Sequence, residues 1–501
     1  MYELMMKDVR SAFATGKTRT YEWRISQLKA IMRCLQENSD KINEVLFKDL
    51  HKHSLESVVM EANMCVSEAI DCINNLKDWM KPEKVSKPAL YMMDTAYIQS
   101  EPYGVALIIG AWNYPIQLTL LPLIGAIAAG NCVVLKPSEV SAASAQFLQD
   151  YLPKYVDNDC IKVVNGAVPE TTALLKEKFD FIMYTGNSFV ARIVMEAASK
   201  HLTPVLLELG GKSPAYVDKG TDMEVVARRL CWGKFANAGQ TCVAPDYVMC
   251  QKDMQDELIK NLKATIEAFY TADPKSSDSF GRIVNEKHFQ RVQKLKKGAE
   301  VAVGGGDVEE EKYIAPTVLR DVKLTDPVMQ DEIFGPLLPI MPVQDHAEAI
   351  KIINDRDKPL SLYVFSNNKS LIQEFRLGTS SGAFLVNDTV VHGGLNTLPF
   401  GGVGNSGMGR YHGKHSFDSF SHQKAVLEKS LALDSVNQLR YPPYSDTKLG
   451  WLQWIMKKKV KRTGVFSFLP FVVMGAMFAM FYKTAGVMAD SVGAGQDNGQ
   501  M

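Results

Sequence analysis

A cysteine, an asparagine and two glutamates lie in short segments from which they could do covalent chemistry together. Cys242 is in FANAGQTCVAP, a small polar loop that follows a predicted helix. Such a loop can bring backbone N–H groups close to a reacting oxygen, and an exposed thiolate is a strong nucleophile. Asn113 in GAWNYP follows a predicted strand, where its amide could donate to an oxyanion. Glu208 in LELGGKSP ends another strand, and Glu332 in QDEIFGP precedes a Phe-Gly-Pro turn.

Each of these residues also has a purely structural explanation. A lone cysteine is more often a small buried hydrophobic residue than a nucleophile. An asparagine after a strand is more often a turn former, and a glutamate at a strand end is more often solvated. The residue types alone therefore leave the chemistry open, and it depends on the elements that position these residues.

The elements around these residues follow an alternating pattern after an N-terminal helical region. Helices are predicted at 21–38, 39–50 and 55–79. Continuous apolar strands are then predicted at 103–110, 132–135, 161–164, 179–184 and 205–208, with helices at 117–129, 138–151 and 189–201. Such strands, separated by helices, favour a parallel sheet covered on both faces. Polar residues at the strand ends, such as Glu208, would then lie where open α/β folds bind ligands.

A second α/β block is predicted downstream. Helices are expected at 222–236 and 254–270, and strands at 247–250, 338–342, 362–365 and 382–386. A candidate edge strand at 424–429 follows the Gly-rich stretch 401–413. A chain of 501 residues is too long for one hydrophobic core, so the two blocks fit an α/β protein with more than one domain.

Composition excludes several classes of protein. Lys+Arg and Asp+Glu both number 56, so no net positive charge is available to hold nucleic acid, and no nucleic-acid partner is expected. The eight cysteines form no CxxC motif or paired spacing, which predicts no metal site, no disulfide framework and a reducing compartment. The N-terminus has no apolar run after its basic residues and is not typical of a secretory signal.

Residues 463–482 (TGVFSFLPFVVMGAMFAMFY) carry no charge. At about 1.5 Å per residue, one helix of this length could cross the roughly 30 Å hydrocarbon core of a bilayer. The preceding run KKKVKR marks the cytosolic flank, so the large N-terminal part is expected in the cytosol. The sequence predicts a single-pass C-terminal transmembrane helix with a tail at 483–501. A buried core helix kinked at Pro470 is the alternative.

The segment before this stretch, 446–462, is amphipathic and basic. Leu449, Leu452, Ile455 and Met456 share one helical face, and the basic residues gather toward the C-terminal end. The segment could lie on the membrane surface or across a substrate entrance. The endoplasmic reticulum is the first expectation for the membrane, and the outer surface of mitochondria or peroxisomes is the alternative.

Longer segments of the chain resemble the aldehyde dehydrogenase superfamily. ELGGKSP is followed 29 residues later by NAGQTC, and then by EIFGP and PFGGVGNSGMGRYHG. LPFGGVGNSGMGRYHGKHSFDSFSH, TCVAPDY and KHLTPVLLELGGKSP are similar to the class 3 branch. The hydrophobic tail resembles the membrane-bound fatty aldehyde dehydrogenases of that branch. The resemblance runs continuously through residues 1–445.

This resemblance implies roles for the residues named above. Cys242 matches the family nucleophile, which attacks the aldehyde carbon, and Asn113 with the Cys242 backbone N–H would hold the resulting oxyanion. Glu208 matches the base that activates water to hydrolyse the thioester. Glu332 matches a residue that hydrogen-bonds the nicotinamide ribose, and Phe334 of the same motif is expected at the cofactor. The expected reaction is oxidation of medium- to long-chain aliphatic aldehydes to carboxylic acids.

The cofactor expected from the resemblance is NAD, with NADP possible but less favoured. Lys136 and Glu139 in LKPSE match the pair around the adenosine ribose, where Glu139 would repel a 2′-phosphate. Gly186, Asn187 and Ser188 form the turn of YTGNSFVAR, which follows a strand and opens a helix as a pyrophosphate site requires. Related sequences often carry glycine where this chain has Ala191, and we expect only a small adjustment there.

The resemblance also implies a domain layout and an assembly. A Rossmann-like NAD-binding domain is expected at 1–80 and 100–208, and an α/β catalytic domain at 209–420. A small oligomerisation element is expected at 81–99 and 421–445, and with it a homodimer. Two other functions stay open: a relative that passes the thioester to coenzyme A, and a silent membrane scaffold. Glu208 argues against the former, and the intact set of Cys242, Glu208, Asn113 and Glu332 argues against the latter.

Overall fold

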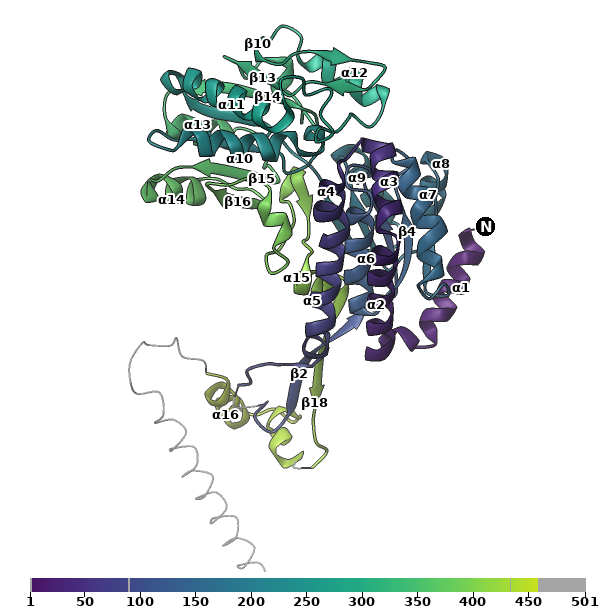
Figure 1. Ribbon diagram of the computed structural model, residues 1–501. Coiled ribbons are helices and arrows are strands. Elements are labelled where there is room, and N and C mark those ends of the chain that lie inside the picture. Colours follow the sequence, from purple (N-terminus) through teal and green to yellow (C-terminus); the bar gives the residue numbers. More distant parts are fainter. Residues whose placement is uncertain (1, 89–90, 433, 458–501) are drawn as a thin grey trace, which may run out of the picture. The chain divides into compact units, whose positions relative to one another are not determined.

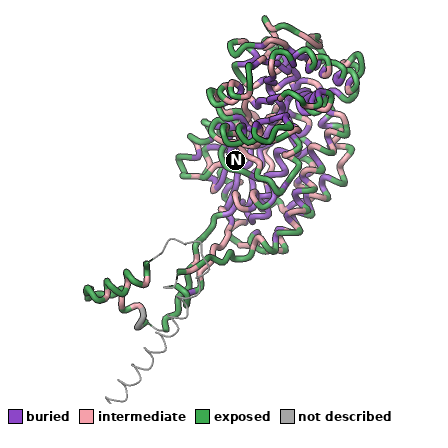
Figure 2. The backbone as a smooth tube through the Cα atoms, turned by 90° about the vertical axis from the view of Figure 1, so that its left-hand side faces the viewer, coloured by how far each residue is buried: buried purple, intermediate pink, exposed green. Residues whose placement is uncertain are grey.

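The structure is a computed structural model in which residues 2–88, 91–432 and 434–457 are described (Figure 1). The chain divides into a large unit, Met1–Val85 with Tyr97–Val426, and a small unit that contains Ser86–Ala96 and the chain from Leu427 onward. The large unit holds two large sheets, one of six and one of seven strands, each with its own hydrophobic core. Figure 2 shows buried backbone concentrated in these two parts of the large unit. The α/β fold with a Rossmann-like and a second α/β domain is therefore confirmed.

The first sheet has the strand order β17-β7-β6-β3-β4-β5. Its strands are β3 (Val105–Ile109), β4 (Cys132–Lys136), β5 (Ile161–Val163), β6 (Phe181–Thr185), β7 (Val205–Glu208) and β17 (Gly407–Met408). All pairs are parallel except β17 with β7, which is antiparallel. The five strands predicted between residues 103 and 208 are thus confirmed, and β17 is an addition from much later in the chain.

Helices from the N-terminal region pack with the long buried helix of this domain. They are α1 (Tyr2–Ala14), α2 (Tyr21–Glu37), α3 (Ser39–Leu50), α4 (Ser54–Ser57) and α5 (Asn63–Trp79). α2 and α5 run beside α6 (Gln117–Ala129), in which every residue is buried (Figure 1). The single helix predicted at 55–79 is interrupted by a π-helical turn, η2 (Val58–Ala62).

Three further helices complete the first domain: α7 (Ala142–Tyr151), α8 (Val168–Leu174) and α9 (Ser188–Ser199). α7 begins four residues later than the predicted start at 138. Its first turn is fixed from outside, because the Asp49 carboxylate accepts hydrogen bonds from the backbone N–H groups of Ala143 (3.0 Å) and Ser144 (2.8 Å). Such a tertiary cap leaves no local signal in the sequence.

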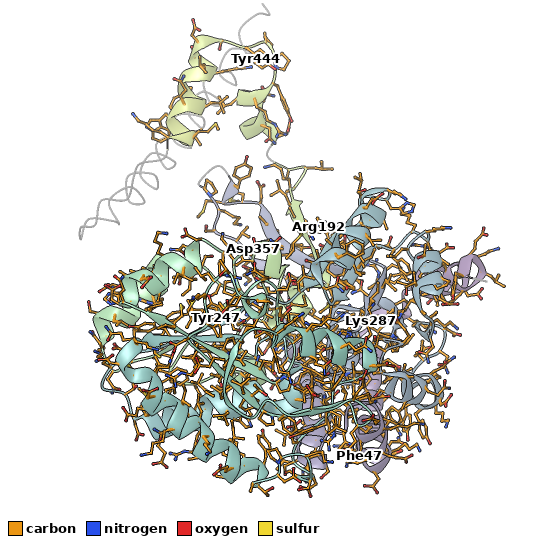
Figure 3. All side chains as sticks on the ribbon, turned by 90° about the horizontal axis from the view of Figure 1, so that it is seen from above. Phe47, Arg192, Tyr247, Lys287, Asp357 and Tyr444 are labelled. Atoms are coloured by element: carbon orange, nitrogen blue, oxygen red, sulfur yellow. The ribbon has the colours of Figure 1, made fainter. Side chains whose placement is uncertain are left out.

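The second sheet has the order β10-β13-β14-β9-β8-β15-β16. Its strands are β8 (Pro214–Val217), β9 (Tyr247–Gln251), β10 (Glu300–Val303), β13 (Thr317–Arg320), β14 (Leu337–Val343), β15 (Ser361–Phe365) and β16 (Ala383–Val386). All pairs are parallel except the edge pair β10 with β13. Tyr247, at the start of β9, lies within the packed side chains of this domain (Figure 3).

Helices and a small hairpin surround this sheet. They are α10 (Met223–Phe235), α11 (Gln255–Tyr270), α12 (Glu286–Leu295), α13 (His346–Asn354) and α14 (Lys369–Gly378), with the hairpin β11 (Asp307–Val308) and β12 (Tyr313–Ile314). α15 (Gly413–Ser419) comes later in the chain and packs against α5 and α6 of the first domain.

A third sheet joins β1 (Glu83–Lys84), β2 (Thr95–Pro102) and β18 (Ser421–Glu428) in the order β1-β2-β18. The candidate edge strand at 424–429 is therefore a strand. In the small unit, α16 (Asp446–Met456) has no buried residue. Among the described residues, no helix is long and apolar enough to span a bilayer. The predicted transmembrane segment 463–482 lies outside the described residues, and the predicted domain boundaries remain expectations.

Candidate active site

The carboxyl ends of four parallel strands bring the predicted site residues to one edge of the first sheet. Lys136 ends β4, Gly186 follows β6 and Glu208 ends β7. Asn113 comes four residues after β3 ends at Ile109. Parallel strands place their carboxyl ends at the same edge, which is where open α/β sheets bind ligands. The second domain supplies the loop of Cys242 and the turn of Glu332 to this region.

Cys242 differs from the other cysteines in its exposure. All eight lie in the described part of the chain, and the other seven are buried. Cys242 follows the short helix η5 (Ala236–Gly239), in which Asn237 and Ala238 have left-handed φ values of 52° and 51°. These conformations are costly for non-glycine residues and are typical of functional loops held by their surroundings. Cys242 is thus the one cysteine of this chain that is not fully buried.

The surroundings of the Cys242 thiol have opposing effects on its pKa. Burial raises the pKa most, and the nearby carboxylates of Glu332 and Glu208 raise it further. The backbone N–H groups of Cys242 and Val243 point at the sulfur and lower the pKa. The net result is a thiol whose pKa lies well above its usual range. These contributions also show that the structure brings Cys242, Glu208 and Glu332 together.

Asn113 is attached to the loop that carries Cys242. Its side-chain amide donates to the backbone carbonyl of Gln240 (3.0 Å), two residues before the cysteine. The neighbouring Tyr114 hydroxyl hydrogen-bonds the Thr241 hydroxyl (2.7 Å). Asn113 is 3% exposed, so its amide is fixed in a dry environment where a hydrogen bond to a developing charge is strong.

The Glu208 carboxylate is buried without a hydrogen-bonding partner. Neither carboxylate oxygen bonds any group in the described parts of the chain, although the side chain is fully enclosed. Burial therefore raises the pKa of Glu208 well above the ordinary value for a glutamate. An unsatisfied buried carboxylate is costly, and such groups are concentrated at functional sites. The polar partner that it lacks would be supplied by a water or substrate.

Glu332 packs against the glycines that follow Glu208. A Cβ on Gly210 would stand 2.1 Å from a Glu332 carboxylate oxygen, so only glycine allows this approach. The Gly211 backbone N–H donates to the Glu332 carboxylate, but burial dominates and raises its pKa to about 8. Gly239, with φ of 76°, approaches the Gly335 carbonyl in the same way, since its Cβ would lie 2.3 Å away. The ELGG, NAGQ and EIFGP segments thus pack directly on one another.

Phe334 lies in an aromatic cluster beside these segments. Its ring meets the Trp112 ring edge to face, with centroids 5.2 Å apart, and Trp112 also contacts His288 at 4.8 Å. Phe334 has a left-handed φ of 46°. Because Trp112 precedes Asn113, this cluster connects the EIFGP turn to the Asn113 loop.

The predicted cofactor turn has the geometry of an anion site. Asn187 caps α9 by accepting a hydrogen bond from the Val190 backbone N–H (2.9 Å), and the Asn187 N–H donates to the Tyr184 hydroxyl (3.1 Å). Ser188 is the first residue of α9, whose first turn contains no acidic residue. A Cβ on Gly186 would meet the Tyr184 hydroxyl at 2.2 Å. The positive end of the helix dipole is thus available to a pyrophosphate, and Ala191 is buried within the same helix.

Lys136 and Glu139 form an ion pair with an Nζ to Oε2 distance of 2.6 Å. The lysine side chain is 3% exposed and the glutamate side chain 41% exposed, so the carboxylate reaches toward solvent. Lys136 also donates to the Pro137 carbonyl (3.0 Å). This pair places one cationic donor and one carboxylate acceptor side by side at the end of β4.

Apolar side chains line the surroundings of the thiol. Cys242 packs with Val243, Leu360 and Val390, and the partly buried Met60 and Phe400 join the same cluster. Met60 also packs with a second small cluster: Ala111, Tyr114 and Leu118. The walls beside the nucleophile thus suit an aliphatic or aromatic substrate rather than a charged one.

Several residues of this site were not predicted from the sequence. Asn237 and Gln240 lie in the NAGQTC segment, where proximity to Cys242 could have indicated them. Lys52 and Glu61 come from the N-terminal helical region and are fully buried as an ion pair. No sequence signal identifies them, because the segment around Lys52 is polar and typical of an exposed loop.

Comparison with known proteins identifies the family of this chain. The aldehyde dehydrogenase family profile matches residues 2–426. The chain is 49% identical over 475 residues to aldehyde dehydrogenase family 3 member A2 of Mus musculus, which covers 95% of this chain and 98% of the relative. It is 53% identical over 434 residues to the dimeric NADP-preferring aldehyde dehydrogenase of Mus musculus, with coverages of 87% and 96%.

A solved structure of an aldehyde dehydrogenase is also similar to this chain. The substrate-bound state of Staphylococcus aureus AldH superposes with a TM-score of 0.89 at 41% identity, covering 91% of this chain and 100% of that chain. The family match, the relatives and the solved structure thus agree on the family. The chain belongs to the aldehyde dehydrogenase family and is an NAD(P)-dependent enzyme that oxidises aldehydes to carboxylic acids.

Proposed function

We propose that this enzyme oxidises medium- to long-chain aliphatic aldehydes through covalent catalysis by Cys242. The observation that carries the proposal is the exposure of Cys242: it alone among the eight cysteines is partly exposed, beside the carboxylates of Glu208 and Glu332. The Cys242 thiol first gives up its proton to solvent. The resulting thiolate attacks the aldehyde carbon, and a C–S bond forms as the carbonyl π electrons move to oxygen. The product is a thiohemiacetal oxyanion on Cys242.

Two donors stabilise this oxyanion in the proposal. The Asn113 amide has two N–H bonds, of which one is used on the Gln240 carbonyl and the other remains for the substrate. The second donor is the backbone N–H of Cys242. Both act in a largely buried site, where such interactions are strong because they need no reorganisation during the reaction. Collapse of the oxyanion releases a hydride from the substrate carbon and leaves a thioester on Cys242.

The bound nicotinamide supplies the hydride acceptor. Gly186, Asn187 and Ser188 would hold its pyrophosphate at the start of α9, and Lys136 and Glu139 its adenosine ribose. Glu332 and Phe334 would hold the nicotinamide end, since they pack on the ELGG segment and beside Trp112. The Glu139 carboxylate disfavours a 2′-phosphate, so we propose NAD as the preferred cofactor. The NADP-preferring relative indicates that NADP use has to be measured as well.

Glu208 is proposed as the base that completes the cycle. Its raised pKa makes its carboxylate a stronger base, and the carboxylate has no competing partner in the described structure. It takes a proton from water, the hydroxide oxygen attacks the thioester carbon, and the C–S bond breaks. The proton held by Glu208 passes to the departing sulfur, so the Cys242 thiol and the Glu208 carboxylate are restored as the carboxylic acid leaves.

The proposed substrate class follows from the lining of the site and the tail. Met60, Val243, Leu360 and Phe400 form an apolar wall beside Cys242, which favours an alkyl chain. Each buried methylene contributes about 0.8 kcal/mol, so long aldehydes both bind well here and partition into lipid. An anchor at 463–482 would keep the enzyme at a membrane, with its catalytic part in the cytosol and the endoplasmic reticulum as the expected site. A homodimer is proposed because the similar mouse enzyme is dimeric.

A panel of straight-chain aldehydes from two to sixteen carbons tests this function. The full chain in detergent is assayed with NAD and with NADP, and kcat/KM is expected to rise with chain length and to be larger with NAD. Cys242→Ser should reduce turnover to less than about a tenth, since a hydroxyl is far less ionised than a thiol, while NAD still binds. A preference for short aldehydes would refute the substrate class. Retained turnover in Cys242→Ser would refute the nucleophile.

A further inference from the structure

A buried ion pair lies beneath the loop that carries Asn113. Lys52 follows α3, Glu61 belongs to the π-helical turn η2, and both side chains are fully excluded from solvent. The Lys52 ammonium donates directly to the Glu61 carboxylate. Removing two charges from water costs several kcal/mol for each ion, so such a pair is an expensive way to stabilise a fold. Its position suggests another role.

The two members of the pair hold the Asn113 loop on both sides. Lys52 Nζ donates to the Asn113 carbonyl (2.8 Å) and stands 3.9 Å from the centre of the Tyr114 ring. The second Glu61 oxygen accepts hydrogen bonds from the backbone N–H groups of Ile116 (2.9 Å) and Gln117 (3.3 Å), where α6 begins. The short segment Asn113 to Gln117 is therefore fixed before and after Tyr114 by one ion pair.

The Asn113 loop is also hydrogen-bonded to the loop that carries Cys242. The Asn113 carbonyl also accepts a hydrogen bond from the Asn237 side chain (2.8 Å), and Asn237 donates to the Gln240 carbonyl as well (3.1 Å). With the Asn113 to Gln240 and Tyr114 to Thr241 bonds, these contacts form one network between the ion pair and Cys242. A displacement of the Asn113 carbonyl would therefore shift the Asn113 amide relative to the loop that carries Cys242.

The π-helical turn that supplies Glu61 has a second connection to the site. Its neighbour Met60 packs in the apolar cluster that includes Cys242. π-helical turns such as η2 are rare overall, but those that occur are often at functional sites. The extra residue in such a turn redirects side chains that a regular helix would place elsewhere. Here the turn directs Met60 to the apolar cluster around Cys242 and Glu61 to the ion pair with Lys52.

We propose that Lys52 and Glu61 are positioning residues for aldehyde oxidation, which orient the oxyanion-binding amide of Asn113 relative to Cys242. The inference rests on the proposed role of Asn113. The two residues touch neither substrate nor cofactor, and they act through the backbone of the Asn113 loop. Their loss should therefore slow the formation of the thioester without weakening cofactor binding.

Neutralising both residues together is the central experiment. Single variants Lys52→Met and Glu61→Gln each leave an unpaired partner and should lower Tm, whereas the double variant Lys52→Met/Glu61→Gln removes both charges and should regain most of the lost Tm. The rate of NADH formation in the first turnover, with octanal as the probe, should stay about tenfold to a hundredfold below wild type in the double variant. The KM for NAD should remain within about twofold of wild type, as expected when only the acylation geometry changes.

Arg24→Met is the matched control. Arg24 is also a buried cation that donates to backbone carbonyls, but its partners are Thr18 and Arg19, just before α2, and Ala128 at the far end of α6. Its loss should lower Tm with little change in the first-turnover rate. If the neutral double variant recovers both Tm and rate, or if Arg24→Met slows the first turnover equally, the positioning role is refuted. Should no variant with Lys52→Met fold, Glu61→Gln carries the rate test, because Lys52 then loses the carboxylate that holds it at the Asn113 carbonyl. Its first turnover should be slowed with an unchanged KM for NAD, and a wild-type rate would refute the positioning role.

A double-mutant cycle separates this inference from the proposed function. If the pair acts through Asn113, neutralising the pair in an Asn113→Ala background should cause no further loss of rate. Multiplicative losses would show an independent, merely structural effect and overturn the proposal. If Asn113→Ala alone leaves the rate unchanged, the oxyanion role fails together with this inference. If Asn113→Ala is slow and the neutral pair is as fast as wild type, only the positioning role fails.

Discussion

The Cys242 thiol and the Glu208 carboxylate are both held in surroundings that disfavour their charged forms. Burial raises the pKa of each, and each group lies near enough to the other for like charges to repel. A site that must form a thiolate and later a carboxylate therefore benefits from having them ionise at different steps. The closeness of Cys242 and Glu208 does not by itself show that their charged forms are disfavoured, because that effect comes mainly from burial.

The raised pKa of Cys242 predicts how the cofactor-free enzyme reacts with an alkylating reagent. Only the thiolate reacts, so the rate of inactivation by iodoacetamide should rise about tenfold per pH unit from pH 7 to pH 9 without a plateau. Cys242→Ser measures the background from the seven buried cysteines. A plateau below pH 8 would show that the backbone N–H groups at the sulfur outweigh burial.

Glu208→Gln should separate the two halves of the reaction. Because the base acts after acylation, rapid-quench kinetics should show a burst of NADH followed by a slow steady state. The folded-state pKa of Glu208 is raised, so its ionisation costs stability as pH rises above its unfolded pKa. The variant should accordingly gain Tm relative to wild type at pH 8 but not at pH 4. Equal losses of burst and steady-state rates would contradict the deacylation role.

The residues of the site differ in how far the sequence could indicate them. Cys242, Glu208, Asn113 and Glu332 lie in Gly-containing motifs at strand ends or loops, and the structure brings their segments into contact. Lys52 and Glu61 could not be predicted, because their burial follows from packing between segments distant in the sequence. Nothing in HKHSLESVVMEA distinguishes a buried lysine from a solvated one, or a π-helical turn from a regular helix.

Among the elements, the start of α9 makes the most direct prediction. Asn187→Ala removes the side-chain cap on Val190 and should cost about 1 kcal/mol of stability. It should also raise the KM for NAD severalfold, since the same turn would bind the pyrophosphate. Asn368→Ala is the matched control, because Asn368 caps α14 by the same type of bond in the second domain. It should lower Tm similarly and leave the KM for NAD unchanged. Equal effects on KM would argue against the cofactor turn.

Elements with strong local patterns were predicted well. The buried strand β7 and the apolar helix α6 match their predicted bounds of 205–208 and 117–129. Short or half-exposed elements were missed, among them β2, β8, β10, β13 and α12 to α14. β10 has exposed and half-exposed residues, so it produces no continuous apolar run. Their positions depend on neighbouring strands.

For the whole molecule, the tail makes the clearest prediction. Truncation after Arg440 removes the uncharged stretch 463–482 and should move the enzyme from the membrane pellet to the supernatant after a carbonate wash. The catalytic rate with a short aldehyde should remain, since the site residues all precede residue 410. The full chain is the control and should stay in the pellet. A truncated chain that still pellets would show that the anchor lies elsewhere.

The antiparallel pairing of β17 with β7 has a consequence for biosynthesis. Gly407 pairs with Glu208, so the strand that ends in the proposed base has its outer neighbour supplied about 200 residues later. While ribosomes translate the intervening part, β7 remains an open sheet edge, with backbone groups free to pair with other chains. The second domain is in effect an insertion that must fold before the first sheet can close. Chaperone dependence during synthesis should therefore end only when the segment around Gly407 emerges, and stalled chains shorter than this should aggregate through β7.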